Sequence, residues 1–206
     1  MKQQKKRPKT VTKSALRQFC QAAQAVGLLD LNKALVLSAR KGQADVVQVL
    51  LDGGADVHFG ADTALWNASA CGHTETARVL LVNGANINPH CDGYSEGGRT
   101  SPLFAAACAG QEKTVKFLLE SGADVHVEND LPLVCAAQYY WPRVVQALLD
   151  GGADVHARND FAVKAALGVA RVNSVSKWRS SATQKDIKDT LTVLRAAGAI
   201  VPVNYL

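Results

Sequence analysis

Residues 63–88 read TALWNASACGHTETARVLLVNGANIN, and this stretch determines the fold. Its second half places Ala77, Leu80 and Leu81 on one helical face, which predicts an amphipathic helix. Its first half is a shorter, alanine-rich helical segment, and Gly72 between the two halves predicts a sharp turn. Gly84 follows the second helix, where a left-handed residue closes the last turn, and glycine adopts that conformation without steric cost. The stretch is therefore predicted to be a helix, a turn, a helix and a short loop.

The same pattern recurs along most of the chain. The pentapeptide GADVH begins at residues 54, 122 and 152, GANIN begins at residue 84, and a divergent copy, GAIVP, begins at residue 198. Five copies are therefore expected, at about residues 32–58, 61–88, 100–126, 130–156 and 160–201. Each copy offers one apolar residue as a buried anchor of its first helix and one small residue for close helix packing. The anchors are Leu35, Leu65, Leu103, Leu133 and Val163, and the small residues are Ser38, Ala68, Ala106, Ala136 and Ala166.

TALWNASACGHTETARVLLVNGANIN and SPLFAAACAGQEKTVKFLLESGADVH resemble ankyrin repeats over their whole length. The resemblance covers roughly residues 32–201 and implies an all-α solenoid, in which stacked helix-turn-helix units are joined by short β-turn or finger loops. It also implies that the chain binds another protein. The glycines of neighbouring copies are 30 residues apart in two cases, below the usual period of about 33, so the units are compact. The histidine of the family's TPLH opening is replaced by Val36, Trp66, Phe104, Val134 and Lys164.

Two insertions and two distinct ends interrupt the regular array. Residues 88–100 and 172–184 are polar and rich in glycine or serine, which predicts loops, and loops inserted in solenoids often line the binding face. Residues 12–31 carry apolar side chains on one helical stripe, which predicts a capping helix over the first repeat. At the other end Arg195 replaces a leucine and supplies the polar outer face that an open solenoid needs.

Positive charge is concentrated at the N-terminus. Residues 1–13 hold six of the 23 basic residues and no acidic residue, so the remaining chain has a net charge of −1. Residues 1–11 are expected to form a disordered basic tail. Lys5, Lys6, Arg7 and Lys9 resemble a nuclear localisation signal or an arm that contacts nucleic-acid phosphates, and a solubilising tail explains so short a run equally well. A nuclear or nucleic-acid-associated regulatory role is the alternative function, although the neutral body argues against nucleic-acid binding by the repeats.

Composition and motifs argue against membrane insertion, metal binding and catalysis. No apolar run approaches the roughly 18 residues of a membrane span and no signal-peptide core is present, so we expect an intracellular protein of the cytoplasm or nucleus. The five cysteines form no close pair, which predicts buried or idle thiols and no disulfide framework or zinc site. No phosphate-binding loop, nucleophile elbow or metalloprotease motif occurs. We therefore expect a monomer with no cofactor, no metal and no enzymatic activity.

The histidines form a column of their own. His58, His126 and His156 each follow GADV, and Asn88 stands in the same place in the second copy. Stacked repeats lie about 10 Å apart, so polar residues compatible with a turn are favoured over a set of metal ligands. The aspartate of GAD is expected to bond to the local backbone of that turn.

Aromatic residues gather at positions that line the binding face of a solenoid. Tyr139, Tyr140 and Trp141 stand where other copies have polar residues, small residues and the turn glycine, while Trp66 and Phe104 share the replaced-histidine position. Large aromatic side chains are favoured anchors of protein interfaces, although packing between units explains Trp66 and Phe104 equally well. The predicted partner-binding residues, with the charged members at the edges, are Arg40, Lys41, Trp66, Asn67, Phe104, Tyr139, Tyr140, Trp141, Arg158 and Lys164.

Overall fold

The computed structural model describes residues 30–89, 101–168 and 183–202, together with residues 18, 22 and 27. Its helices are α2 (Leu31–Arg40), α3 (Ala44–Asp52), α4 (Phe59–Ala70), α5 (Thr74–Val82), α6 (Pro102–Cys108), α7 (Glu112–Glu120), α8 (Leu131–Gln138), α9 (Pro142–Asp150), α10 (Ala157–Ala166) and α11 (Gln184–Ala196). No strand occurs within these described ranges, which agrees with the predicted all-α fold.

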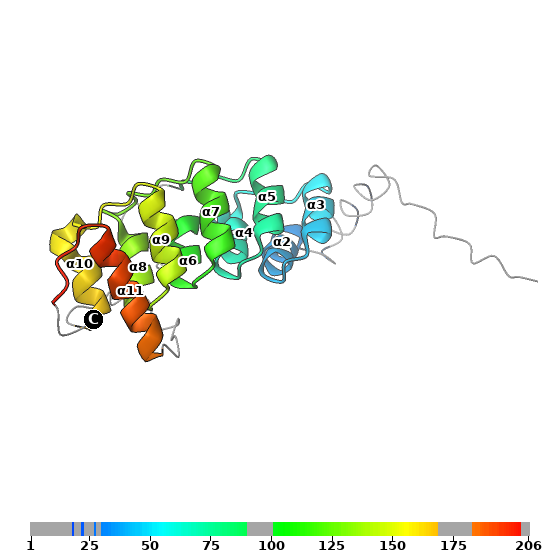
Figure 1. Cartoon of the computed structure of the whole chain (residues 1–206). Coiled ribbons are helices and arrows are strands. Elements are labelled where there is room, and N and C mark those ends of the chain that lie inside the picture. Colours follow the sequence, from blue (N-terminus) through cyan, green and yellow to red (C-terminus); the bar gives the residue numbers. More distant parts are fainter. Residues whose placement is uncertain are drawn as a thin grey trace, which may run out of the picture.

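The helices form two layers that run along one axis (Figure 1). α2, α4, α6, α8 and α10 pack on one another in chain order and form the first layer, and α3, α5, α7, α9 and α11 form the second. Each first-layer helix also packs on the second-layer helix that follows it. The main contacts therefore join neighbouring units, which is the arrangement of a solenoid. α2 lies toward one end of the array, and α10 and α11 lie at the other.

One continuous apolar core lies between the two layers. The predicted anchors and small residues of the first layer are all buried, with no anchor more than 3% exposed. The second layer contributes Val47, Leu50, Ala77, Leu80, Val115, Leu118, Val145, Leu148, Leu191 and Leu194. Because burying one large aliphatic side chain contributes about 1.5–3 kcal/mol, this ladder of leucines and valines stabilises each junction between units.

The loop glycines have the left-handed backbone that the sequence predicts. The φ angle is 98° at Gly54, 95° at Gly84, 93° at Gly122, 97° at Gly152 and 102° at Gly198. In each case the glycine follows a second-layer helix, and the amide of the next residue bonds back into that helix. The five glycines thus close the second helices and direct the chain into the finger loops.

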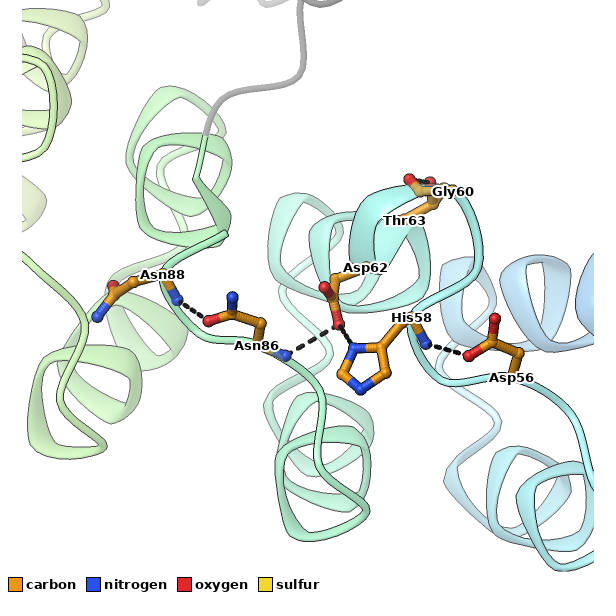
Figure 2. Close-up of polar contacts among 7 residues, drawn as sticks. All are labelled: Asp56, His58, Gly60, Asp62, Thr63, Asn86 and Asn88. Carbon is orange, nitrogen blue, oxygen red and sulfur yellow. Dashed lines mark hydrogen bonds and ion pairs between the residues drawn. The ribbon is translucent and has the colours of Figure 1, made fainter. Parts of the chain in front are cut away.

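A three-residue left-handed turn lies in three of the finger loops. Residues 60–62, 128–130 and 158–160 have φ angles between 51° and 63°. Such a conformation costs a non-glycine residue about 1–2 kcal/mol. In the first of these turns, the buried Asp62 provides compensating contacts, because its Oδ1 accepts a hydrogen bond from the Asn86 amide at 2.9 Å and lies 3.1 Å from Nδ1 of His58 (Figure 2). The carboxylate thus ties the start of the unit to its closing loop.

The same tie is repeated along the array. Oδ1 of Asp130 accepts a hydrogen bond from the Asp154 amide at 3.0 Å, and Oδ1 of Asn32 accepts one from the Asp56 amide at 2.8 Å. The aspartates of GAD also bond to the local backbone as predicted, since Oδ1 of Asp56 accepts from the His58 amide at 2.9 Å (Figure 2). The first, second and fourth units are therefore closed by a polar bridge as well as by the apolar core.

Asn88 carries this bridge across the first insertion. Its Oδ1 accepts a hydrogen bond from the Asp124 amide at 2.9 Å, and its Nδ2 donates one to the Gly122 carbonyl at 3.0 Å. Asn88 stands in the histidine column, but the insertion separates it from the first helix of the next unit. Asn88 therefore accepts the hydrogen bond from the closing loop that the aspartate of the left-handed turn accepts in the second and fourth units.

Polar groups cap the start of α11, the last described helix of the array. Oγ1 of Thr183 accepts a hydrogen bond from the Asp186 amide at 3.2 Å, and Oδ2 of Asp186 accepts one from the Thr183 amide at 2.8 Å. These bonds form a capping box at the start of α11. The Thr183 hydroxyl and amide hold the pKa of Asp186 below its ordinary value. Arg195 is exposed on α11, as expected for a polar end.

The tail 1–11, nearly all of the capping segment 12–31, and most of the insertions 88–100 and 172–184 lie outside the described residues. Within the described ranges, no helix is long and apolar enough to cross a membrane.

Candidate partner-binding surface

Tyr139, Tyr140 and Trp141 form the turn between α8 and α9, and we call these three residues the aromatic turn. All three side chains are half-buried. Tyr140 has a φ angle of 58°, in the position that Gly42, Gly72 and Gly110 occupy in the first three units. A bulky residue in the left-handed region is an outlier that costs on the order of 1 kcal/mol or more. The second turn position of this unit is therefore strained where the other units have glycine.

Tyr139 packs against the first layer. It ends α8 and contacts a buried cluster made of Phe104, Cys108, Leu131 and Cys135. Burial of the ring raises the pKa of the Tyr139 phenol above its ordinary value. The side chain thus contributes to the junction between the third and fourth units while keeping part of its surface exposed.

Trp141 packs across the junction in a different way. A Cβ atom added to Gly110 would lie 2.6 Å from Cδ2 of Trp141, so the indole lies directly over that glycine. The indole Nε1 donates a hydrogen bond to the Cys108 carbonyl at 3.2 Å. In the first junction, His73 takes the same place: it lies over Gly42, and its Nε2 is 3.1 Å from the Arg40 carbonyl. Trp141 therefore keeps a repeated contact between units and adds aromatic area to it.

A hollow of about 310 Å³ lies beside the aromatic turn. Tyr140 and Trp141 line it together with Gly110, Glu112, Pro142, Arg143, Val144 and Asp186. The hydrogen bond from Lys116 and the positive charges of Lys116 and Arg143 hold the pKa of Glu112 below its ordinary value. The hollow is thus lined by aromatic surface, ionised carboxylates and one exposed guanidinium.

Phe104 does not belong to the predicted surface. Its side chain is only 4% exposed and lies in the buried cluster with Cys108, Leu131 and Cys135, because the neighbouring helices α4 and α8 cover α6 on both sides. The prediction that it contacts a partner is therefore wrong. The alternative considered from the sequence, packing between units, holds for this residue.

Trp66 and Asn67 are half-buried on α4. Nε1 of Trp66 is buried and has no hydrogen-bond partner among the described residues, and Nδ2 of Asn67 donates to the Thr63 carbonyl at 2.8 Å. Both residues remain predicted surface residues, with less of each side chain available than expected.

The four charged residues do not form one patch. Arg40 and Lys41 are exposed at the end of α2, toward one end of the array, while Arg158 and Lys164 are exposed on α10 at the other (Figure 1). The latter two also have structural partners: Nη2 of Arg158 donates to the Glu128 carbonyl at 2.7 Å, and Nζ of Lys164 donates to the Asn159 carbonyl at 2.6 Å. Lys5, Lys6, Arg7 and Lys9 lie outside the described residues.

The prediction of buried or idle thiols without a disulfide is wrong for two of the five cysteines, which are buried but bonded to each other. Cys108 of α6 and Cys135 of α8 form a disulfide, with their Cα atoms 5.2 Å apart. Their separation of 27 residues gives no local motif. Aligning the third and fourth copies places them on adjacent first-layer helices, and this was the signal available from the sequence. Cys71 is free and exposed.

The histidines of the column each contact an aspartate side chain, which a polar residue that only fits the turn does not require. Nδ1 of each histidine lies close to Oδ1 of an aspartate. The distance is 3.1 Å from His58 to Asp62, 3.1 Å from His126 to Asp130 and 2.6 Å from His156 to Asp160. The aspartate stands four residues after the histidine in each case, a repeated spacing visible in the sequence. Among the described residues, no group of three or more potential metal ligands comes together. The column therefore braces the left-handed turns.

Comparison with known families places this architecture. The model described as "Ankyrin repeats (3 copies)" matches residues 10–91, 31–129 and 89–159. These matches cover well over half of the chain, and the two-layer stack of helix pairs agrees with them. The chain belongs to the ankyrin-repeat family.

Several curated relatives are similar over part of the chain. The fruit fly protein "Ankyrin repeat and KH domain-containing protein mask" is 39% identical over 48% of the chain, and the human "Ankyrin repeat and KH domain-containing protein 1" is 38% identical over the same share. The rice "Probable E3 ubiquitin-protein ligase XBOS33" is 40% identical over 37% of the chain. The aligned regions cover only 2%, 4% and 15% of these relatives, respectively. The similarity thus concerns a repeat segment of much larger proteins.

Proposed function

We propose that this chain is a non-catalytic adaptor or inhibitor that binds a partner protein through the aromatic turn and the adjoining ends of the first-layer helices. Ankyrin repeats are in general protein-interaction modules. The observation that carries the specific proposal is the aromatic turn, where Tyr140 takes a strained left-handed conformation in place of glycine. Strain of this kind concentrates at functional sites, and tyrosine and tryptophan are favoured interface anchors.

The chain itself supplies substitutions that should preserve the fold. Alanine stands at the position of Tyr139 in the third copy, glycine at that of Tyr140 in the first three copies, and histidine at that of Trp141 in the second copy. Tyr139→Ala, Tyr140→Gly and Trp141→His therefore introduce residues that the same scaffold already accepts. Trp141→His also keeps a ring N–H able to bond the Cys108 carbonyl, as His73 does with Arg40.

Affinity capture with quantitative mass spectrometry identifies the partner, and a binding titration with the purified partner then tests the surface. Tyr139→Ala and Trp141→His should each weaken binding by about 1–3 kcal/mol, while circular dichroism stays unchanged. Lys188→Ala, an exposed position on α11, is the control and should bind like the wild type. If both aromatic variants bind normally, the aromatic turn belongs only to the packing between units and the proposal fails.

The basic run of the tail supports a separate proposal, localisation to the nucleus of an otherwise intracellular protein. Replacing Lys5, Lys6, Arg7 and Lys9 with alanine should shift a fluorescent fusion of the full chain towards the cytoplasm. An unchanged distribution would leave the run as a solubilising tail. Contact with nucleic acid would appear instead as salt-sensitive binding that the same substitutions remove.

A further inference from the structure

The disulfide lies at one junction of the array and against the aromatic turn. Cys108 ends α6 in the third unit, Cys135 lies within α8 in the fourth, and both are 0% exposed. The preceding junction, between the second and third units, has alanine at both positions, Ala70 in place of Cys108 and Ala105 in place of Cys135. The scaffold therefore folds without a cross-link at this place, and the cysteine pair is particular to the junction that carries the aromatic turn.

Both half-cystines contact the aromatic turn directly. The Cys135 carbonyl accepts a hydrogen bond from the Tyr139 amide at 3.1 Å, and the Cys108 carbonyl accepts one from the Trp141 indole at 3.2 Å. The Tyr139 ring packs against the buried cluster to which both cysteines belong. A change in the relative position of α6 and α8 would therefore move the Trp141 acceptor, which lies on α6, and alter the cluster against which Tyr139 packs.

We propose that the Cys108–Cys135 disulfide is a redox-controlled cross-link that holds the aromatic turn in its binding arrangement. Two molecules of a low-molecular-weight thiol reduce it: the thiolate of the first attacks one sulfur and breaks the protein S–S bond, and the released cysteine takes a proton. The second thiol then attacks the mixed disulfide, so that the other cysteine leaves as a thiol and the small-molecule disulfide is the oxidised product. The reverse reaction, with a low-molecular-weight disulfide as oxidant, restores the cross-link.

Burial makes the exchange depend on opening of the junction. Because neither sulfur is exposed, an attacking thiolate reaches the bond only after α6 and α8 separate locally. The cross-link opposes that separation, since it adds a covalent tie between two helices that also pack on each other. The oxidised form thus keeps the junction closed, and the reduced form opens it more often. This role rests on the proposed partner surface, but the state of the junction can be measured without a partner.

The test compares oxidised and reduced full-length protein. The wild type is equilibrated with glutathione disulfide or with a reducing phosphine, thiols are counted under denaturing conditions, and amide hydrogen exchange is measured by mass spectrometry. The oxidised sample should have two fewer thiols than the reduced sample, located at Cys108 and Cys135 by peptide mapping. Exchange of residues 131–141 should be at least about tenfold faster after reduction, with residues 44–82 unchanged.

Two variants make the outcome specific. Cys108→Ala/Cys135→Ala, built from residues of other copies, should exchange like the reduced wild type and should not respond to the oxidant. Cys71→Ala, at the free exposed cysteine, should respond as the wild type does. The inference is overturned if the oxidant removes no thiols from the pair, or if residues 131–141 exchange equally in both redox states. The partner surface proposed above would survive either result, because the titration with aromatic variants tests it separately.

Discussion

The turn glycines offer a direct measure of how the aromatic turn packs. Gly84 and Gly110 both have a left-handed backbone, with φ angles of 95° and 72°. A Cβ atom added to Gly84 would meet no atom within 4 Å, whereas one added to Gly110 would meet the Trp141 indole at 2.6 Å. Gly84→Ala therefore introduces backbone strain alone, and Gly110→Ala introduces a similar strain plus a steric conflict with a ring that is held in place.

The expected losses of folding stability follow from the backbone strain and the steric conflict. Left-handed strain of about 1–2 kcal/mol, offset by about 0.4–1 kcal/mol from the lower entropy of the unfolded chain, gives a loss of about 1 kcal/mol for Gly84→Ala. Overpacking adds about 1–3 kcal/mol for Gly110→Ala, so its total loss is about 2–4 kcal/mol. Each kcal/mol lowers Tm by about 2–4 °C in a chain of this size.

Thermal denaturation followed by circular dichroism measures both variants in two backgrounds. In a Trp141→Ala background no ring lies over the glycine, so the extra cost of Gly110→Ala should shrink by at least about half, while the cost of Gly84→Ala should stay the same. Equal losses for the two alanine variants in the wild-type background would refute the packing of Trp141 on Gly110. A stability loss for Gly110→Ala that is the same whichever residue stands at position 141 would also refute this packing.

Three further perturbations test other parts of the structure. Asn88→Ala removes two hydrogen bonds that bridge the first insertion and should cost about 1–3 kcal/mol in urea denaturation, whereas Asn88→Asp keeps the acceptor for the Asp124 amide and should cost less. Arg158→Ala removes the hydrogen bond to the Glu128 carbonyl and should make the amides of α10 exchange faster than they do in a Lys185→Ala control. Equal exchange in the two variants would show that this hydrogen bond does not stabilise α10. Because the pKa of Asp186 is lowered in the folded state, its capping contribution is present above the ordinary aspartate pKa and is lost as the pH falls through the folded-state pKa. The start of α11 should therefore fray in acid. An NMR titration should show this pH dependence in the wild type and not in Asp186→Asn.

The fold was predictable because each unit repeats the same physical constraints. The spacing of Leu80 and Leu81 defines a helical face, and Gly84 meets the steric demand of a left-handed closing residue, which its φ angle of 95° confirms. Both signals depend on local sequence, and the leucine pair recurs in four copies and the glycine in five, so errors in one copy are corrected by the others.

Features that join different copies were harder to predict. Phe104 and Tyr139 are both aromatic, but the first is covered by α4 and α8 while the second ends its helix and keeps an exposed part, and this difference depends on packing across units. The Cys108–Cys135 bond likewise requires knowledge of which first-layer helices are neighbours. Aligning Trp141 with His73 shows that the two share a position, but the packing of each ring over the preceding unit's glycine is visible only in the structure.

Amide hydrogen exchange of the complex tests the central claim, that a partner binds at the aromatic turn, most directly. The measurement compares the full chain with and without the partner identified by affinity capture. We expect protection on binding to centre on residues 138–143, with the outward-facing second-layer helices α3 and α5 exchanging at the same rate in both states. Protection confined to the second layer, with residues 138–143 unaffected, would contradict the account.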